Sequence, residues 1–307
     1  MTEISYFGYD DCIALDNGAT RVVLGTAGGR VLEYAVGGVN ALMLEDTQAG
    51  WRYQESDPRV ELCGGRCDIG PEQIIAGHPD LWFGTWEGMA TGPRSARLVS
   101  SEDQGVGVQL MRDFELADTG SHLRCTQTIL NVSPRAIDTC HWGRTFAQGH
   151  GIVVLPVTEP SRFPQHYVMY GPGGIDTRPE DANIHVRDGV LTVTGPPQYA
   201  KLGMDSNAGW FAYLMRNDLL FVKRFLTYPD RVYNEVAGLT TSIWYHGTQV
   251  CELEPIGPRE LLAPGESSSF TEEWWLLPQP FPADPSQVDV AAVVARVEAE
   301  TIAPMID

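Results

Sequence analysis

Basic residues are scarce in this chain of 307 residues. Lysine and arginine number 21 against 40 aspartates and glutamates, which gives a formal net charge of −19 at pH 7. Proteins that bind nucleic acid or anionic membranes need basic side chains to neutralise phosphate groups. The composition therefore argues against nucleic acid and anionic membrane surfaces as partners. The acidic balance favours solubility and by itself says nothing about a substrate.

Long apolar runs and the common cofactor motifs are also missing. No stretch approaches the length of a transmembrane helix, and the N-terminus lacks the basic and apolar regions of a signal peptide. Residues 25–29 do not match the dinucleotide-binding pattern G-x-G-x-x-G, and the chain contains no G-x-x-x-x-G-K-[ST] and no H-E-x-x-H motif. We therefore expect no cofactor and no membrane association.

Cysteine is sparse and scattered. A disulfide framework is typical of short secreted chains that are dense in cysteine, which this chain is not. Cys63 and Cys67 have three residues between them but no second pair of Cys or His at finger spacing, so we expect no metal site. The expected location is the cytoplasm. The six cysteines are Cys12, Cys63, Cys67, Cys125, Cys140 and Cys251.

Short β-rich runs separated by turn residues make up most of the chain. Asp188-Gly189, between two alternating runs, predicts a hairpin, and the proline- and glycine-rich stretch 155–174 predicts a long loop. Helical periodicity appears only near the end, where Ser286 can cap a helix. The sequence therefore predicts an all-β fold, an antiparallel β super-sandwich. It forms one domain over residues 1–307, with a short C-terminal helix at about 286–303.

The stretch Val250–Pro278 is the most informative part of the sequence. Glu252 and Glu254 are two residues apart, which places both carboxylates on one face of a strand. Pro264-Gly265 suits a type II turn, because proline presets the first central φ and glycine supplies the positive φ of the second. The run Phe270–Leu277 predicts the strand that follows. A glutamate buried beside a tryptophan would have the raised pKa that suits proton transfer.

Two further clusters combine the side chains that sugars need, namely apolar platforms for C–H faces and planar polar groups for hydroxyls. The first contains His78, Trp82 and Glu87. In the second, Lys201 lies between aromatic and glycine-rich residues and could reach a sugar oxygen or a carboxylate. We predict that these four residues bind the substrate.

A fourth cluster follows Asn131 and contains His141 and Arg144. These two side chains would face opposite sides of a regular strand, although a bulge could bring both inward. Arg144 and Glu254 are also predicted to bind the substrate.

These motifs resemble the galactose mutarotase-like (aldose 1-epimerase) superfamily. The likeness lies in the strand with Cys251-Glu252, the Pro264-Gly265-Glu266 turn, and the strand after Asn131 that carries His141. The resemblance implies a β super-sandwich that interconverts sugar anomers without a cofactor, with a glutamate base and a histidine acid. It implies catalytic roles for Glu252 and His141. The identity of the general acid stays open among His150, His166, His185, Lys201 and Arg144.

Three hypotheses for function remain. The first is an aldose 1-epimerase-like isomerase that acts on a monosaccharide or a derivative. The second is another carbohydrate enzyme on the same fold, either a polysaccharide lyase or a glycoside hydrolase. The third is a sugar-binding protein without turnover. In each case the expected partner is a small-molecule carbohydrate, and a homodimer is left open.

Overall fold

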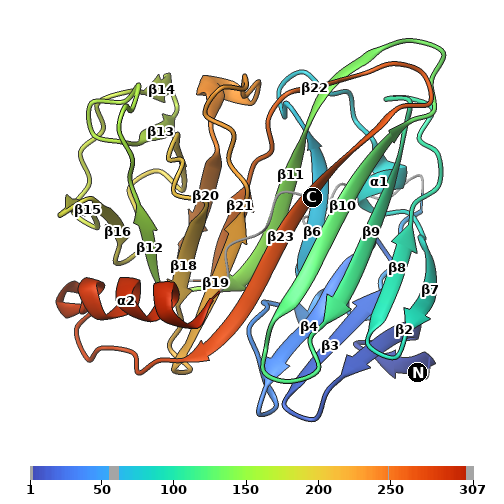
Figure 1. Ribbon diagram of the computed structural model, residues 1–307, viewed down its shortest axis with the longest axis horizontal. Helices are drawn as coiled ribbons and strands as arrows, with labels where there is room; N and C mark the ends of the chain where they lie inside the picture. The colour runs from blue at the N-terminus through green and yellow to red at the C-terminus, as the bar shows by residue number, and fades with distance from the viewer. Residues whose placement is uncertain (1–2, 55–61, 248, 302–307) are drawn as a thin grey trace.

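The computed structural model describes residues 3–54, 62–247 and 249–301. In these residues every strand pairing is antiparallel, and the strands form two sheets that pack face to face (Figure 1). Most of the buried apolar side chains form one cluster with members from both sheets. The prediction of an antiparallel β super-sandwich is therefore confirmed.

The first sheet contains 13 described strands. Its main path runs in the order β1 (Glu3–Tyr6), β2 (Tyr9–Asp16), β3 (Thr20–Gly25), β4 (Arg30–Val36), β6 (Gly65–Gly70), β11 (Ile137–Gln148), β21 (Val250–Pro255), β20 (Thr241–His246), β17 (Lys201–Met204), β13 (Val168–Gly171) and β14 (Gly174–Asp176). The short strands β5 (Val39–Asn40) and β22 (Glu260–Leu262) pair with β4 and β11.

The second sheet contains 10 described strands. Its order is β15 (Ile184–Arg187), β16 (Val190–Val193), β12 (Ile152–Pro156), β18 (Trp210–Leu214), β19 (Leu219–Phe225), β23 (Ser267–Pro278), β10 (Leu123–Asn131), β9 (Val108–Leu116), β8 (Ser95–Val99) and β7 (Glu87–Gly92). The described helices are α1 (Pro79–Trp82), α2 (Val290–Glu300) and the 3₁₀ turns η1 (Asp46–Gln48), η2 (Val236–Gly238) and η3 (Pro285–Gln287).

Helix α2 lies against the outer face of the second sheet (Figure 1). Val293 and Val297 are buried there against apolar residues of β12, β18, β19 and β23. The predicted C-terminal helix is present, but it begins at Val290. Its cap is Asp289, whose Oδ1 accepts a hydrogen bond of 2.9 Å from the backbone nitrogen of Ala292. Ser286 lies in the separate turn η3, and residues 302–303 lie outside the described residues.

The sequence-based hairpin and loop predictions have different outcomes. Asp188-Gly189 joins β15 to β16, with Arg187 opposite Val190, and both turn residues have positive φ. The predicted loop at 155–174 is interrupted, because β12 extends to Pro156 and β13 begins at Val168. The connection between these two strands is therefore shorter than predicted.

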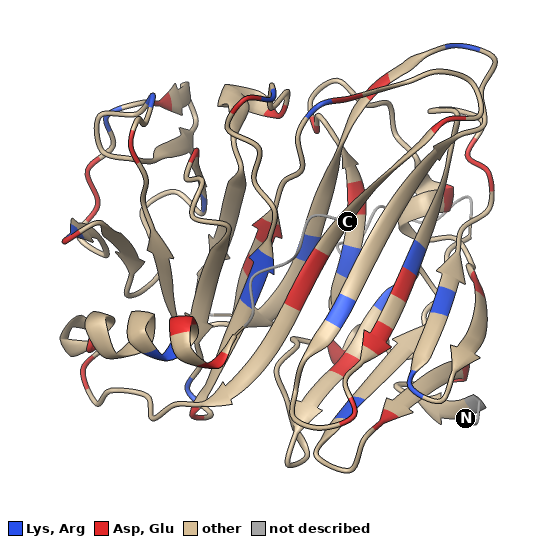
Figure 2. Ribbon diagram, in the orientation of Figure 1, with Lys and Arg blue, Asp and Glu red and all other residues tan. Residues whose placement is uncertain are grey.

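A buried ion pair in the second sheet is hydrogen-bonded to the first sheet. Nζ of Lys223 on β19 lies 2.8 Å from Oε2 of Glu272 on β23, and both side chains are almost fully buried. Lys223 also donates to Oγ1 of Thr145 on β11 of the first sheet, at 2.7 Å. Figure 2 shows that charged residues occur along the central strands as well as on the loops. Burial of Lys223 and Glu272 is tolerated because each side chain makes further hydrogen bonds besides the ion pair.

Breaking this pair should be far more costly than breaking an exposed one. Lys223→Met leaves the Glu272 carboxylate buried without its cation, which should lower the free energy of unfolding by about 3–5 kcal/mol. Arg97→Met breaks the exposed pair with Asp113 (2.7 Å) and should cost about 0–1 kcal/mol. Urea unfolding of both variants measures the difference. Equal losses would contradict the assignment of Lys223 and Glu272 as a buried core pair.

Candidate active site

The candidate site lies on the outer face of the first sheet. On its central strands, alternate residues such as Leu253 on β21 and Ile243 on β20 join the core between the sheets. The residues between them therefore point to the opposite face. Strand register aligns Phe146 with Glu252 and Glu252 with Trp244, and Trp244 is aligned with Lys201. Four neighbouring strands thus present one row of side chains.

This row lines a small cavity of about 220 Å³. Phe146 and Trp244 form two aromatic walls of the cavity. Their rings meet edge to face with centroids 6.2 Å apart. The remaining lining residues are charged, and both signs occur. The complete described lining is Glu72, Arg144, Phe146, Lys201, Trp244, Glu252 and Glu254. Aromatic walls with a few convergent polar groups are typical of small-molecule sites.

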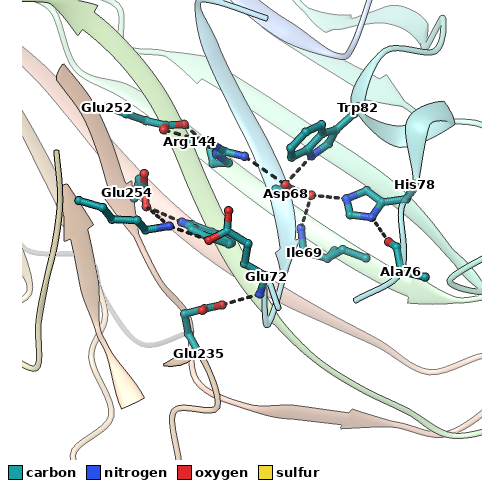
Figure 3. A network of polar contacts seen from close by, with 12 residues as sticks. Asp68, Ile69, Glu72, Ala76, His78, Trp82, Arg144, Glu235, Glu252 and Glu254 are labelled. Carbon is teal, nitrogen blue, oxygen red and sulfur yellow. Dashed lines mark hydrogen bonds and ion pairs between the residues drawn. The ribbon is translucent and has the colours of Figure 1, made fainter. Parts of the chain in front are cut away.

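Arg144 and Glu252 form a two-pronged ion pair inside the cavity (Figure 3). Nε of Arg144 donates to Oε1 of Glu252 at 2.7 Å, and Nη2 donates to Oε2 at 3.2 Å. Burial alone would raise the pKa of Glu252, but the charge and hydrogen bonds of Arg144 outweigh it and hold the pKa below its ordinary value. Glu252 is therefore ionised at neutral pH.

Asp68 on β6 holds the other side of this guanidinium. Its Oδ2 lies 3.7 Å from Nη1 of Arg144 and accepts a hydrogen bond from the indole N–H of Trp82. Its Oδ1 accepts from the backbone nitrogen of Ile69 at 2.8 Å and lies 2.7 Å from Nε2 of His78. Burial raises the pKa of Asp68, but the hydrogen bond and charge of His78, with the charges of Arg144 and Arg66, outweigh burial and lower the pKa below its ordinary value. Asp68 therefore orients Arg144 as a carboxylate.

His78 has an acceptor at each ring nitrogen. Nδ1 lies 2.7 Å from the carbonyl oxygen of Ala76, and Nε2 lies 2.7 Å from Oδ1 of Asp68. Burial lowers the pKa of His78, but the hydrogen bond and charge of Asp68 prevail and raise the pKa above its ordinary value. Only the imidazolium can donate at both nitrogens, so this geometry favours the charged form.

Glu254 has weaker partners than its neighbour Glu252. Its Oε2 accepts a hydrogen bond of 3.0 Å from the indole N–H of Trp142 and lies 4.0 Å from Nζ of Lys201. Its Oε1 accepts no hydrogen bond from the described residues, and a hydrogen bond shared with Glu252 favours the protonated form of Glu254. Burial raises the pKa of Glu254 to about 8; Lys201 opposes this shift and the charge of Glu252 adds to it. At neutral pH the two carboxyls therefore hold one proton between them.

Lys201 links the cavity to the protein surface. Its Nζ lies 2.7 Å from Oε2 of Glu72, whose side chain is 45% exposed, and 4.5 Å from the centre of the Trp142 ring. Burial lowers the pKa of Lys201, and the charges of Glu254 and Glu72 overcome this effect and raise it. Glu72 is fixed in turn, because its backbone nitrogen donates to Oε2 of Glu235 at 2.9 Å (Figure 3).

Four of the sequence-predicted site residues line this cavity, namely Arg144, Lys201, Glu252 and Glu254. His78 and Trp82 adjoin it through Asp68, and the Trp82 ring centre lies 5.2 Å from the Arg144 guanidinium carbon.

His141 and Glu87 lie elsewhere. β11 keeps a regular register from Cys140 to Thr145, so His141 faces away from Arg144. Nε2 of His141 lies 3.1 Å from Oγ of Ser268 on the second sheet, and burial lowers the pKa of His141 to about 3. Glu87 is exposed on β7, at the far edge of the second sheet.

The other three histidines considered as acids also lie away from the described cavity lining. His150 is exposed in the turn after β11. Nε2 of His166 lies 3.6 Å from Oε1 of Glu159, and His185 lies on β15 at the end of the second sheet.

Sequence reasoning missed three lining residues and the orienting carboxylate. Phe146 and Trp244 lie in strands that are largely buried on both faces, and the sequence of such a strand does not distinguish a cavity wall from the core. Neither Glu72 nor Asp68 is assigned a role from the sequence. The signal that could have found Asp68 is alternation, because Arg66 and Asp68 share one face of β6.

The described residues show neither a membrane-spanning helix nor a metal cluster. None of their helices is both long and apolar enough to cross a membrane. Within the same residues, no group of three or more His, Cys, Asp or Glu side chains has a geometry that could hold a metal ion.

The role of Asp68 can be tested through His78. Asp68→Asn removes the carboxylate that raises the pKa of His78, so burial should then lower that pKa below its wild-type value. NMR titration of the His78 Cε1 proton measures the shift. Asp80→Asn, which removes an exposed carboxylate of α1, serves as the matched control and should leave the pKa unchanged. An unchanged His78 pKa in Asp68→Asn would contradict the arrangement.

The protonation of Glu254 predicts how stability depends on pH. The pKa of Glu254 is higher in the folded state than its ordinary value of 4.5. Its contribution to the free energy of unfolding is therefore fully present below pH 4.5 and is lost as pH rises through about 8. Between pH 4.5 and pH 9, the free energy of unfolding of the wild type should therefore fall by on the order of several kcal/mol more than that of Glu254→Gln. Urea unfolding across this range provides the test. Parallel curves for the two proteins would show that Glu254 is ionised like an ordinary glutamate.

Comparison with known proteins supports the fold assignment. No protein-family model matches the chain, and no curated protein does. Among solved structures, the Slr1438 protein from Synechocystis sp. PCC 6803 has a TM-score of 0.61 and 16% sequence identity, covering 91% of this chain and 100% of that chain. A candidate aldose 1-epimerase from Escherichia coli K12 has a TM-score of 0.60 and 14% identity, covering 87% and 98%.

A galactose mutarotase-like protein from Lactobacillus casei is similar to the same degree. It has a TM-score of 0.60 and 10% identity and covers 87% of this chain and 100% of that chain. At such identities the likeness concerns the fold. The chain has the galactose mutarotase-like fold.

Proposed function

We propose that this protein interconverts the α and β anomers of an aldose or an aldose derivative, with Glu252 as the general base. The observation that carries the proposal is the two-pronged ion pair of Glu252 with Arg144 inside a small cavity with aromatic walls. The galactose mutarotase-like fold agrees with it, since similar folds include a candidate aldose 1-epimerase. The cavity lies below the range of roughly 300–1,000 Å³ typical of drug-sized ligands, which favours a single sugar ring.

Glu252 has the properties that a base for this reaction needs. It is ionised, so it can accept the proton of the anomeric hydroxyl. Each of its oxygens accepts one N–H from Arg144, and a carboxylate oxygen has two lone pairs with which to accept hydrogen bonds. Arg144 is held in turn by Asp68, so the carboxylate orientation is fixed before the sugar binds.

The rest of the cavity suits sugar binding. Trp244 and Phe146 offer apolar surface for the C–H face of a ring, and Lys201 and Glu72 offer polar groups for hydroxyls at the outer end. Lys201 is a hydrogen-bond donor and Glu72 an acceptor, so the two can bind hydroxyl groups in both directions. This combination supports binding of a neutral or modified monosaccharide.

The proposal predicts a separation of binding from turnover. Glu252→Gln keeps the shape of the side chain but removes the proton acceptor, so anomer exchange should fall about 10²–10⁴-fold while sugar binding stays similar. Saturation-transfer NMR over a panel of aldoses measures the exchange, and ligand-induced thermal shift measures binding. The matched control is Glu87→Gln, which alters an exposed carboxylate on β7 and should exchange like the wild type.

Two outcomes would contradict the proposal in different ways. Undiminished exchange in Glu252→Gln would reject Glu252 as the base. Wild-type protein that binds a sugar and does not exchange its anomers would reject the isomerase function. That second result would favour a lyase, a hydrolase or a binding protein on this fold.

A further inference from the structure

The cavity contains a second carboxyl group that the proposed base does not use. Glu254 is 1% exposed and lies two residues after Glu252 on the same face of β21. One of its oxygens accepts the indole N–H of Trp142, and the other accepts no hydrogen bond from the described residues (Figure 3). A buried carboxylate oxygen without a donor is costly, whereas a carboxylic acid hydroxyl in that place can donate to a ligand.

The surroundings decide which of the two carboxyls keeps a proton. Glu252 receives two hydrogen bonds from a guanidinium, and Glu254 receives one from a neutral indole. The charge that most favours ionised Glu254 is that of Lys201, whose Nζ is 4.0 Å from Oε2 of Glu254 and only 2.7 Å from Oε2 of Glu72. Two carboxylates in one buried site do not both ionise readily, so the proton resides on the less supported one.

Other charged and titratable groups face Glu254 from each neighbouring element. Arg144 on β11 and Lys201 on β17 favour its ionised form, whereas Glu252 on its own strand opposes it. Tyr170 on β13 interacts with it electrostatically, as does the thiol of Cys251. Burial prevails over the two cations, and the pKa of about 8 reflects that balance.

The proposed reaction needs an acid next to its base. Opening a cyclic sugar removes a proton from the anomeric hydroxyl and delivers one to the ring oxygen. Both oxygens are bonded to the same carbon, so the acid and the base must each reach an oxygen of that one carbon. Two carboxyls at alternate positions of one strand meet this requirement, since their side chains point the same way.

We propose that Glu254 is the catalytic acid of this site and protonates the ring oxygen of the sugar while Glu252 deprotonates the anomeric hydroxyl. This inference rests on the proposed function. In the first step the bond between the anomeric carbon and the ring oxygen breaks, and a carbonyl forms at the anomeric carbon. Glu252 ends protonated and Glu254 ionised. After rotation about the C1–C2 bond, the two protons return by the reverse transfers, and the ring closes as the other anomer.

The alternative acids are placed less well. His141 faces the core between the sheets, where it contacts Ser268, and burial keeps it neutral. Arg144 is fully engaged with Glu252 and Asp68, and guanidinium groups do not release protons in proteins. Lys201 is the strongest competitor, because it lines the cavity and carries a proton.

Kinetics of two Glu254 variants test the inference. Glu254→Gln keeps a hydrogen-bond donor but has no transferable proton, so kcat for anomer exchange should fall about 10²–10⁴-fold with little change in sugar affinity. The wild-type kcat should decline as pH rises through about 8, and this decline should be absent in Glu254→Gln. Glu254→Asp keeps an acid and should retain more activity together with the alkaline decline.

Lys201→Met separates the two candidate acids. Removing this cation should raise the pKa of Glu254, so the alkaline decline of kcat should move to higher pH. If Lys201 were the acid, the variant would instead lose turnover, and Glu254→Gln would keep it. A ¹³C NMR titration of the Glu254 carboxyl carbon gives a readout independent of turnover, with an expected midpoint of about 8.

The possible failures are distinguishable. A wild type without anomer exchange removes the proposed function and this inference with it. A wild type with exchange, together with a Glu254→Gln variant of undiminished exchange, overturns the inference alone. A carboxyl midpoint near the ordinary value of 4.5 also overturns it, because Glu254 would then carry no proton at neutral pH.

Discussion

The ion pair between Arg144 and Glu252 is the interaction on which the candidate site depends. Both side chains are almost completely removed from water, so each would be costly without the other. Asp68 shares the guanidinium and is itself held by Trp82 and His78. Because Arg144 forms its hydrogen bonds with Glu252, the Glu252 carboxyl is ionised and Glu254 carries the proton of the pair. The unequal properties of two chemically identical side chains follow from this one contact.

Part of this site could be predicted from the sequence because successive side chains of a strand point to opposite faces of the sheet. The spacing of Glu252 and Glu254 places them on one face, and the structure has them there. The same rule predicts that His141 and Arg144 face opposite sides, and the regular register of β11 keeps them apart. Which face of a strand a side chain occupies follows from the sequence of that strand alone, without knowledge of the neighbouring strands.

The rest of the site depends on which strands are neighbours. Phe146, Trp244 and Lys201 converge because β11, β21, β20 and β17 lie side by side, although they are far apart in the sequence. Nothing within each strand indicates that order or its register. The start of α2 was placed too early for a different reason, because Ser286 and Asp289 both suit a cap and only the backbone distinguishes them. The resemblance to mutarotase-like proteins correctly indicated the fold, while the acid stayed open among several residues.

The central claim is that a sugar binds with its anomeric carbon between Glu252 and Glu254. A crystal structure of the Glu254→Gln variant with a bound aldose tests it most directly. We predict an anomeric hydroxyl within about 2.6–3.2 Å of a Glu252 oxygen and a ring oxygen within the same reach of the residue 254 side chain. A sugar bound outside the cavity, or one with its anomeric carbon directed away from β21, would contradict the account.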